Sequence, residues 1–202
     1  MHKEKQGFGD SAIATLNTNA ISAEDMGVHG HYHVVCRDKD GNIKWEEEFP
    51  NLVVAVGKQL MLDTLLRTSG TYTTVGPFLG LTNATLTPAA TDTMTTLVGG
   101  GKEFTNYTVG GSAVRGTAVF AASSSAGSTP SNVTTSTATA ITYTITGAGG
   151  NITGCFVVTG SGAVSTQSST AGTLYSEGNF ATAKVTTAGD TVSVTYSTTA
   201  TS

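Results

Sequence analysis

Charged side chains are scarce in this chain of 202 residues, because Asp, Glu, Lys and Arg together make up 12% of it. An average soluble domain has roughly twice that share. The 10 Lys and Arg residues are outnumbered by 14 Asp and Glu residues, and the net charge is −4. Binding to nucleic acid without sequence preference needs clustered basic side chains that displace counterions from phosphates. The composition therefore predicts that nucleic acid is not a partner.

Cysteines and long apolar runs are also scarce. Cys36 and Cys155 are the only cysteines, too few for a disulfide framework in a chain of this length, so we expect both thiols to be free. No apolar run approaches the roughly 20 residues of a membrane helix. The N-terminus, MHKEKQGFGD, lacks the apolar segment of a secretory signal. These absences predict synthesis in the cytoplasm and no contact with a membrane.

Ser, Thr, Gly and Ala take the place of the missing charges, and hydrophobic residues make up 38% of the chain. This length and composition suit one main domain with its own core, which we place at residues 28–202. Residues 1–27 are polar and weakly periodic, and we interpret them as an extended N-terminal arm. Such an arm either becomes ordered against a neighbour or is simply a disordered terminus.

The C-terminal run, residues 172–199, has a strand-turn-strand pattern with a turn at 188–190. Val192, Val194 and Tyr196 are spaced two apart, which predicts one buried face. Residues 31–49 have the pattern of a hairpin around the turn at 38–42. Further short strands are expected at 71–81, 102–109, 112–121, 139–146, 154–159 and 172–175, and an exposed loop at 159–172. These segments predict a mainly β fold, an antiparallel sandwich of jelly-roll or immunoglobulin-like type.

A single helix is expected at about residues 52–67, where the apolar spacing changes from two to three and four. Asn51 is a candidate N-cap, and Gly70 is a candidate C-terminal stop. The apolar positions predict an amphipathic helix that packs against a sheet; they are Val53, Val56, Leu60, Leu62, Leu65 and Leu66.

His29, His31 and His33 are the strongest candidates for a metal site. Alternate residues of a strand share a face, so three imidazoles could bind one divalent ion. The spacing faintly resembles the His-x-His of cupins, but Cys36 and Arg37 stand where that pattern would place a glutamate. We therefore expect hydrogen-bonded or exposed histidines and predict no metal ligand.

Catalytic patterns are equally weak. Gly160–Gly162 encloses a serine in a flexible tract without the strand-turn-helix of a nucleophile elbow, and Cys36 has no evident orienting partner. In the acidic run 46–48, only Glu46 and Glu48 can share a strand face, which is typical of a charged sheet edge. The glycines before Lys102 open a strand and lack the spacing of a phosphate loop. We predict no catalytic residue, no cofactor site and no enzymatic activity.

Several short motifs recur together in the order that is typical of one family. They are Asn51-Leu-Val-Val, Gly57-Lys-Gln-Leu with the following leucines, Phe78-Leu-Gly-Leu, Ala89-Ala-Thr-Asp-Thr-Met, Glu103-Phe with Tyr107 and Arg115, Gly172-Thr-Leu-Tyr, and Gly189-Asp-Thr. In these residues the chain resembles a family of tailed-bacteriophage virion proteins, over roughly residues 51–196. The N-terminal hairpin and its three histidines lie outside the resemblance.

The resemblance implies a capsid decoration, or cement, protein. Such a protein would be made in the host cytoplasm, bind the major capsid protein on the outer surface of the virion and connect neighbouring capsomers. We expect a small symmetric homo-oligomer, a trimer or a dimer. The alternative is a tail or head fibre module that binds a receptor or carbohydrate through Trp45, Tyr72, Tyr107 or Tyr175. An enzyme built on the histidines is a more distant third.

We predict that deletion of residues 1–26 weakens attachment to the capsid and leaves the fold intact, because the arm is expected to contact a neighbour and not the core. Circular dichroism of the truncated protein measures the fold, and co-sedimentation with capsids measures attachment. Undiminished attachment would contradict the arm hypothesis.

Overall fold

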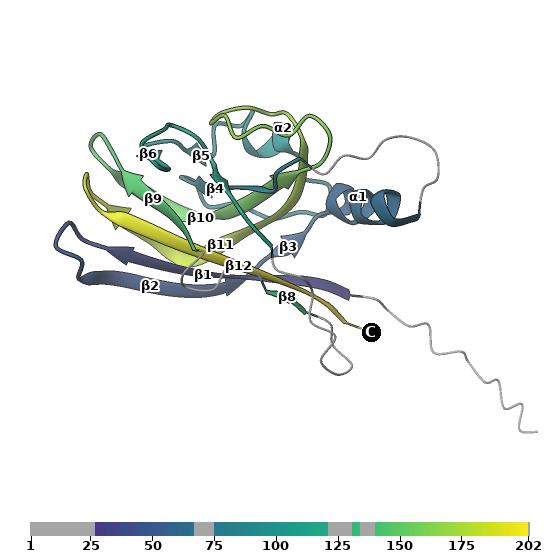
Figure 1. Ribbon diagram of the computed structural model, residues 1–202, viewed down its shortest axis with the longest axis horizontal. Coiled ribbons are helices and arrows are strands. Elements are labelled where there is room, and N and C mark those ends of the chain that lie inside the picture. The colour runs from purple at the N-terminus through teal and green to yellow at the C-terminus, as the bar shows by residue number, and fades with distance from the viewer. Residues whose placement is uncertain (1–26, 67–74, 121–130, 134–139, 202) are drawn as a thin grey trace, which may run out of the picture.

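A computed structural model of the chain describes residues 27–66, 75–120, 131–133 and 140–201. Within these ranges the protein is mainly β, with two antiparallel sheets that form the two layers of a sandwich (Figure 1). The predicted fold class is confirmed. The predicted arm, residues 1–27, lies outside the described residues except for Gly27, the first residue of β1.

Each sheet has six strands in the described part of the chain. Sheet A has the order β2-β1-β12-β9-β6, with β8 paired to β12. Its strands are β1 (Gly27–Arg37), β2 (Ile43–Pro50), β6 (Tyr107–Thr108), β8 (Ser131–Val133), β9 (Ile141–Ile145) and β12 (Thr191–Thr201). Sheet B has the order β3-β11-β10-β4-β5, with β7 paired to β4. Its strands are β3 (Leu52–Val53), β4 (Phe78–Thr82), β5 (Glu103–Phe104), β7 (Gly116–Thr117), β10 (Gly150–Thr159) and β11 (Thr173–Thr186).

The main core lies between the sheets and is built from alternate residues of their strands. On β12, Val192, Val194 and Tyr196 are buried, as their spacing predicted. Sheet A also contributes Tyr32, Val34, Cys36, Ile141, Tyr143 and Ile145, and sheet B contributes Leu79, Leu81, Phe104, Ile152, Cys155 and Val157. Burial of a large apolar side chain stabilises a fold by about 1.5–3 kcal/mol, so this layer dominates the stability.

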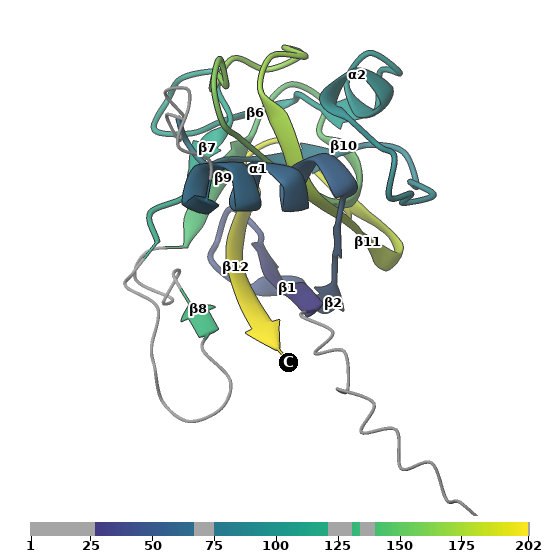
Figure 2. The same ribbon diagram turned by 90° about the vertical axis from the view of Figure 1, so that its right-hand side faces the viewer.

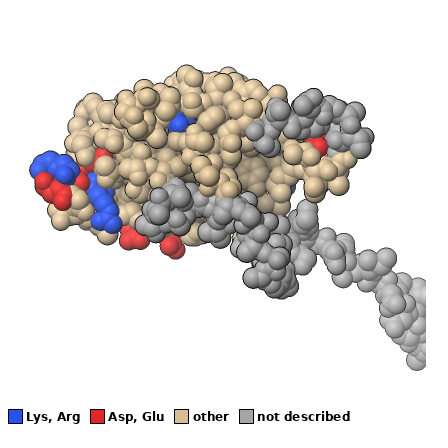
Figure 3. Space-filling view, viewed as in Figure 1, with Lys and Arg blue, Asp and Glu red and all other residues tan. Residues whose placement is uncertain are grey.

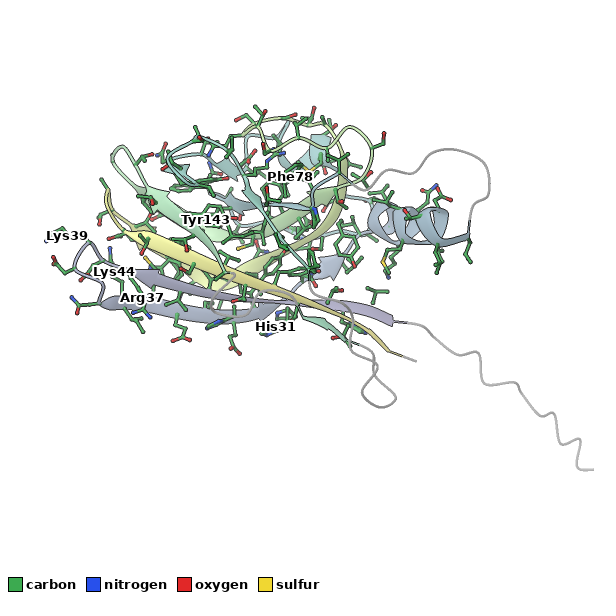
Figure 4. The ribbon with its side chains drawn as sticks, viewed as in Figure 1. His31, Arg37, Lys39, Lys44, Phe78 and Tyr143 are labelled. Carbon is green, nitrogen blue, oxygen red and sulfur yellow. The ribbon has the colours of Figure 1, made fainter. Side chains whose placement is uncertain are left out.

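Three buried tyrosines of sheet A form hydrogen bonds across this core to sheet B. The Tyr143 hydroxyl donates to the Leu79 carbonyl oxygen at 2.8 Å, and the ring lies between the two layers (Figure 4). The Tyr32 hydroxyl lies 3.2 Å from Ser176 Oγ, which also donates to the Tyr196 hydroxyl at 3.4 Å. Because hydrogen bonds are directional, these contacts fix how one sheet sits over the other.

A second, smaller core covers the outer face of sheet B. There α2 (Met94–Leu97) and the loops before β5 and after β10 pack on the strands. Its buried members are Val54, Leu86, Met94, Leu97, Val98, Phe156, Val158, Ala163 and Leu174. The sequence analysis did not anticipate α2, because four residues are too few to show a helical period. A capping box between Thr93 and Thr96 begins this helix.

The N-terminal hairpin is confirmed. Strands β1 and β2 pair antiparallel, with His33 opposite Glu48 and Cys36 opposite Trp45. In the turn, Asp38 Oδ1 accepts hydrogen bonds from the backbone amides of Asp40 and Asn42, both at 2.9 Å. The turn also needs the positive φ of Gly41, which is 87°.

The C-terminal run forms the two predicted strands, but they pair with different neighbours. Strand β11 pairs with β10 in sheet B, and β12 pairs with β1 in sheet A, so the turn between them carries the chain from one layer to the other. Asp190 stabilises this turn by accepting hydrogen bonds from the Thr187 amide at 2.8 Å and from Lys44. Val185 of β11 is exposed.

The predicted helix begins later than expected. Helix α1 spans Ala55–Leu66, because Leu52 and Val53 pair with β11 and form β3 instead. The proposal of Asn51 as the N-cap is wrong: its side chain donates to the Tyr196 hydroxyl at 2.9 Å. The expected stop at Gly70 lies outside the described residues. Neither described helix is long and apolar enough to cross a membrane.

Helix α1 lies across one end of the sandwich, as the view along that end shows (Figure 2). Only Gly57 of this helix is buried, and it packs against the backbone of Tyr175. The prediction that the leucines would be covered by a sheet is therefore wrong. The outer face of sheet B, where such a helix could lie, is already covered by α2 and its loops.

Three other predicted strands are shorter than expected. The segment 102–109 divides into β5 in sheet B and β6 in sheet A, so it crosses between the layers. In the segment 112–121, the described residues 112–120 contain one strand, β7. In the segment 71–81, residues 71–74 lie outside the described residues, and the strand β4 begins at Phe78, after the cis peptide bond before Pro77.

Arg115 is a large side chain that is fully buried, and it holds the loops over sheet B together. Its guanidinium group donates to both carboxylate oxygens of Glu103 at 2.8 Å, and to the carbonyl oxygens of Val164 and Ser169. The bidentate geometry and the extra acceptors compensate for the removal of both charges from water. The loop 159–172, predicted to be exposed, is thus anchored through Arg115.

We predict that Tyr143→Phe lowers the free energy of unfolding by about 0.5–1.5 kcal/mol, because it removes a buried hydrogen bond between the sheets. The matched control is Tyr107→Phe, since the Tyr107 hydroxyl is buried without a hydrogen-bond partner in the described part of the chain. This control is expected to be neutral or stabilising. Urea denaturation of both variants makes the comparison, and equal losses would contradict the prediction.

Candidate functional site

The two ends of the sandwich differ in chemistry. Arg37, Lys39 and Lys44 lie at the end formed by the β1–β2 turn (Figure 4). On the face shown in Figure 3, acidic and basic side chains gather at this end, and most of the remaining surface is uncharged. Helix α1 and Gly27, where β1 begins, lie at the opposite end.

The three histidines share one face, as predicted. His29, His31 and His33 lie on the outer face of sheet A, because the residues between them on β1 are buried. His33 Nε2 lies 2.6 Å from Glu46 Oε1, and His33 Nδ1 lies 3.4 Å from Thr195 Oγ1. Across the described residues, no group of three or more His, Cys, Asp and Glu side chains is placed to hold a metal ion. His33 is therefore a hydrogen-bonded residue of the sheet surface.

The candidate nucleophiles lie in the main core and in turns. Cys36 and Cys155 are buried in the main core. Both thiols are free, so the prediction that neither forms a disulfide is confirmed. Burial raises the pKa of the Cys36 thiol to about 11, so it is protonated at neutral pH. The histidines of β1 face the opposite side of the sheet from Cys36. Gly160–Gly162 forms a turn after β10, and the glycines at 99–101 lead into β5.

The acidic run of β2 divides between two faces. Glu46 and Glu48 point outward, as predicted, on a strand at the edge of sheet A. Glu47 points the other way and pairs with Lys184 at 2.9 Å, and its carboxylate also accepts a hydrogen bond from the Ala181 amide. These contacts, that with Lys184 first, lower the pKa of Glu47. The run therefore connects β2 to β11 through Glu47.

The aromatic residues proposed for sugar stacking are mostly engaged in packing. Tyr107 is buried in the main core. Trp45 packs edge-on against Phe180, and its indole nitrogen donates to the Val185 carbonyl oxygen at 3.3 Å. Tyr175 is half-buried beside α1, and Tyr72 lies outside the described residues.

The exposed leucines of α1 were not anticipated from the sequence. Leu62 is 49% exposed, Leu65 is 79% exposed and Leu66 is 69% exposed. Their spacing of three and four places them on one face of the helix. The sequence did contain a signal of this exposure, because the segment has more apolar residues than one buried stripe of a helix can hold.

An apolar hollow adjoins these leucines, between α1 and β11. Its volume is about 310 Å³, and its lining comes from Leu60, Met61, Thr64, Leu65, Thr159 and Tyr175. The Tyr175 hydroxyl lies 3.5 Å from Met61 Sδ. We call the three leucines and this hollow the apolar end. Among the described residues it is an exposed apolar surface of the kind that marks an interaction site.

A second group missed by the sequence analysis is the carboxyl pair of Asp92 and Glu177, on the outer side of sheet B. Glu177 is buried, and burial together with a hydrogen bond from its carboxyl group to Asp92 raises its pKa to about 8. For Asp92, burial acts to raise the pKa, but hydrogen bonds from Glu177, Ala89 and Thr96 hold it below its usual value. The pair thus shares one proton at neutral pH.

No protein-family model, curated protein or solved structure matches this chain. The residues that carry the family resemblance have structural roles in the fold. Glu103 and Arg115 form the buried ion pair, and Gly57 allows α1 to approach β11. Asp190 holds the turn between the sheets.

The Glu177 carboxyl predicts a pH dependence of stability. Its pKa is about 8 in the folded protein against an ordinary 4.5, so the folded state favours the protonated form. The contribution of Glu177 to stability is therefore greatest below about pH 4.5 and declines as the pH rises toward 8. Glu177→Gln cannot ionise and should flatten this decline, with a gain in unfolding free energy at pH 8.

Urea denaturation at several pH values in the presence of a chelator measures this effect, with Glu48→Gln as the exposed control. The same pH profile in wild type and Glu177→Gln would show that the folded protein does not hold this proton.

Proposed function

We propose that this protein is a capsid decoration protein of a tailed bacteriophage that binds the outer surface of the shell and connects neighbouring capsomers. The observation that carries the proposal is the apolar end, three exposed leucines on α1 beside an apolar hollow. The family resemblance over residues 51–196 supplies the identity of the partner, the major capsid protein.

The apolar end suits a contact with a protein surface. Full burial of a leucine contributes about 1.5–3 kcal/mol, and most of this is still unused for Leu65 and Leu66. Charged residues make up only 12% of the chain, so few ions need to lose water when a partner covers such a surface. In this arrangement the charged β1–β2 turn, at the other end, faces solvent.

Modest contacts are sufficient for such a role. Many copies on one shell, or several copies in one oligomer, bind together and increase the overall affinity without new kinds of contact. A symmetric trimer or dimer would present two or three apolar ends at once, and we propose this oligomeric state.

We predict that Leu65→Glu weakens binding to the capsid at least about tenfold, because it places a charge in the centre of an apolar contact. The fold should be unaffected, since Leu65 is exposed. Co-sedimentation with shells of the encoding phage that lack this protein measures the binding.

The matched control is Ile43→Glu, which introduces the same charge at an exposed apolar residue beside the β1–β2 turn. This variant should bind as wild type does. If Leu65→Glu binds the shells as tightly as the wild-type protein does, the apolar end is not the contact surface. If the wild-type protein does not bind the shells at all, the decoration function is contradicted.

A further inference from the structure

Residues 85–98, which we call the α2 cover, close part of the outer face of sheet B. Leu86, Met94 and Leu97 of the cover are buried in the second core, so apolar contacts hold much of it. A polar contact adds to them at Asn179 of β11. The Asn179 side chain donates to the Leu86 carbonyl oxygen and accepts from the Leu86 amide, both at 2.9 Å. This neutral contact fixes one side of the cover to sheet B.

A second polar contact between the cover and β11 is the carboxyl pair. Glu177 is 2% exposed, and its protonated carboxyl group donates a hydrogen bond to Asp92, the residue before the N-cap of α2. If both groups were ionised, neither could donate a proton to the other, and their like charges would repel. The contact therefore exists only while the pair holds a proton.

The shared proton has a route to water. A hollow of about 110 Å³, enough for a few water molecules, is lined by both carboxyl groups. Among the described residues, Lys102 is the one other charged residue that lines this hollow. Its positive charge acts to lower the pKa of Glu177, but burial and the hydrogen bond to Asp92 outweigh it and raise the pKa to about 8. The pair therefore loses its proton in mildly alkaline solution.

The turn that contains Asp92 also anchors the first residue of α1. Asp92 Oδ2 accepts a hydrogen bond from the Ala89 amide at 2.8 Å, and the Asp92 amide donates to the Ala89 carbonyl oxygen at 3.0 Å. In the same turn, the Ala90 carbonyl oxygen accepts a hydrogen bond from the Ala55 amide of α1 at 2.8 Å. A displacement of Asp92 therefore also displaces an acceptor that holds the start of α1.

We infer that the pair of Asp92 and Glu177 is a pH-sensitive switch that holds the α2 cover on sheet B and the start of α1 in place. Loss of the shared proton replaces a hydrogen bond by a repulsion between two carboxylates. The cover then lifts at Asp92, while Asn179 still holds it at Leu86, and α1 loses its acceptor at Ala90. Because α1 carries the apolar end, the switch also acts on the contact with the shell, a consequence that rests on the proposed function.

Hydrogen–deuterium exchange of the free, full-length chain, followed by NMR, tests this inference without any shell. The reporters are the amides of Ala55 and Asp92, whose hydrogen bonds depend on the switch. Glu177→Gln is the closed reference, because its amide group keeps a donor for Asp92 and has no proton to lose. The wild-type exchange rate divided by the rate of this variant at the same pH cancels the intrinsic effect of pH on exchange.

This ratio should rise at least about tenfold between pH 6 and pH 9 at both reporters. The sign follows from the raised pKa of Glu177, because a contribution of this kind is present at low pH and is lost as the pH rises through the folded-state pKa. Glu48→Gln, the control for an exposed carboxyl group on the outer face of sheet A, should exchange as wild type does at both pH values.

A ratio that stays constant between pH 6 and pH 9 at Ala55 and Asp92 would overturn the inference. So would an equal rise at the amide of Val194 in the main core, since the whole fold would then open and not the cover alone. If Glu177→Gln does not fold, Asp92→Asn takes its place, because its amide donates to the Glu177 carboxylate and removes the repulsion. None of these outcomes depends on whether the protein binds a capsid.

Discussion

The hydrogen-bonded tyrosine layer between the sheets is the constraint on which the rest of the structure depends. Tyr32 and Tyr196 of sheet A meet Ser176 of β11, and this fixes the position of β11 in the opposite layer. Tyr175 stands at a bulge of β11, packs against the main core and forms the wall against which α1 lies. Glu177 is on the outer side of sheet B, where it meets Asp92. Three consecutive residues of one strand therefore contribute to the core, the apolar end and the carboxyl pair.

Local patterns were enough to predict much of this fold. The spacing of Val192, Val194 and Tyr196 gave the buried face of β12, and the turn at 38–42 gave the β1–β2 hairpin. Pairing between strands could not be predicted in the same way. Strands β11 and β12 have the alternation of a hairpin, but alternation is the same whichever partner a strand takes, and here the partners are β10 and β1. The start of α1 was misplaced for a related reason, because the pairing of Leu52 and Val53 with β11 is a long-range contact.

The candidate sites show the same limit. The histidines were correctly placed on one face, since that depends only on strand geometry. Asp92 and Glu177 are distant in the sequence, and nothing near either of them indicates the other. The exposed leucines of α1 were assigned to the core because an apolar helix normally finds a sheet to cover. In this protein α2 and its loops already occupy that face, so α1 is left at the end of the sandwich with its leucines uncovered. The proposed function depends on this position of α1, because it gives the sandwich an apolar surface at one end and charged residues at the other.

Electron microscopy of intact particles, with this protein labelled, tests the central claim most directly. The account predicts density for the protein on the outer surface of the phage head, repeated with the symmetry of the capsomers and with α1 toward the shell. Density on the tail, an orientation with the β1–β2 turn against the shell, or absence of the protein from the particle would contradict it.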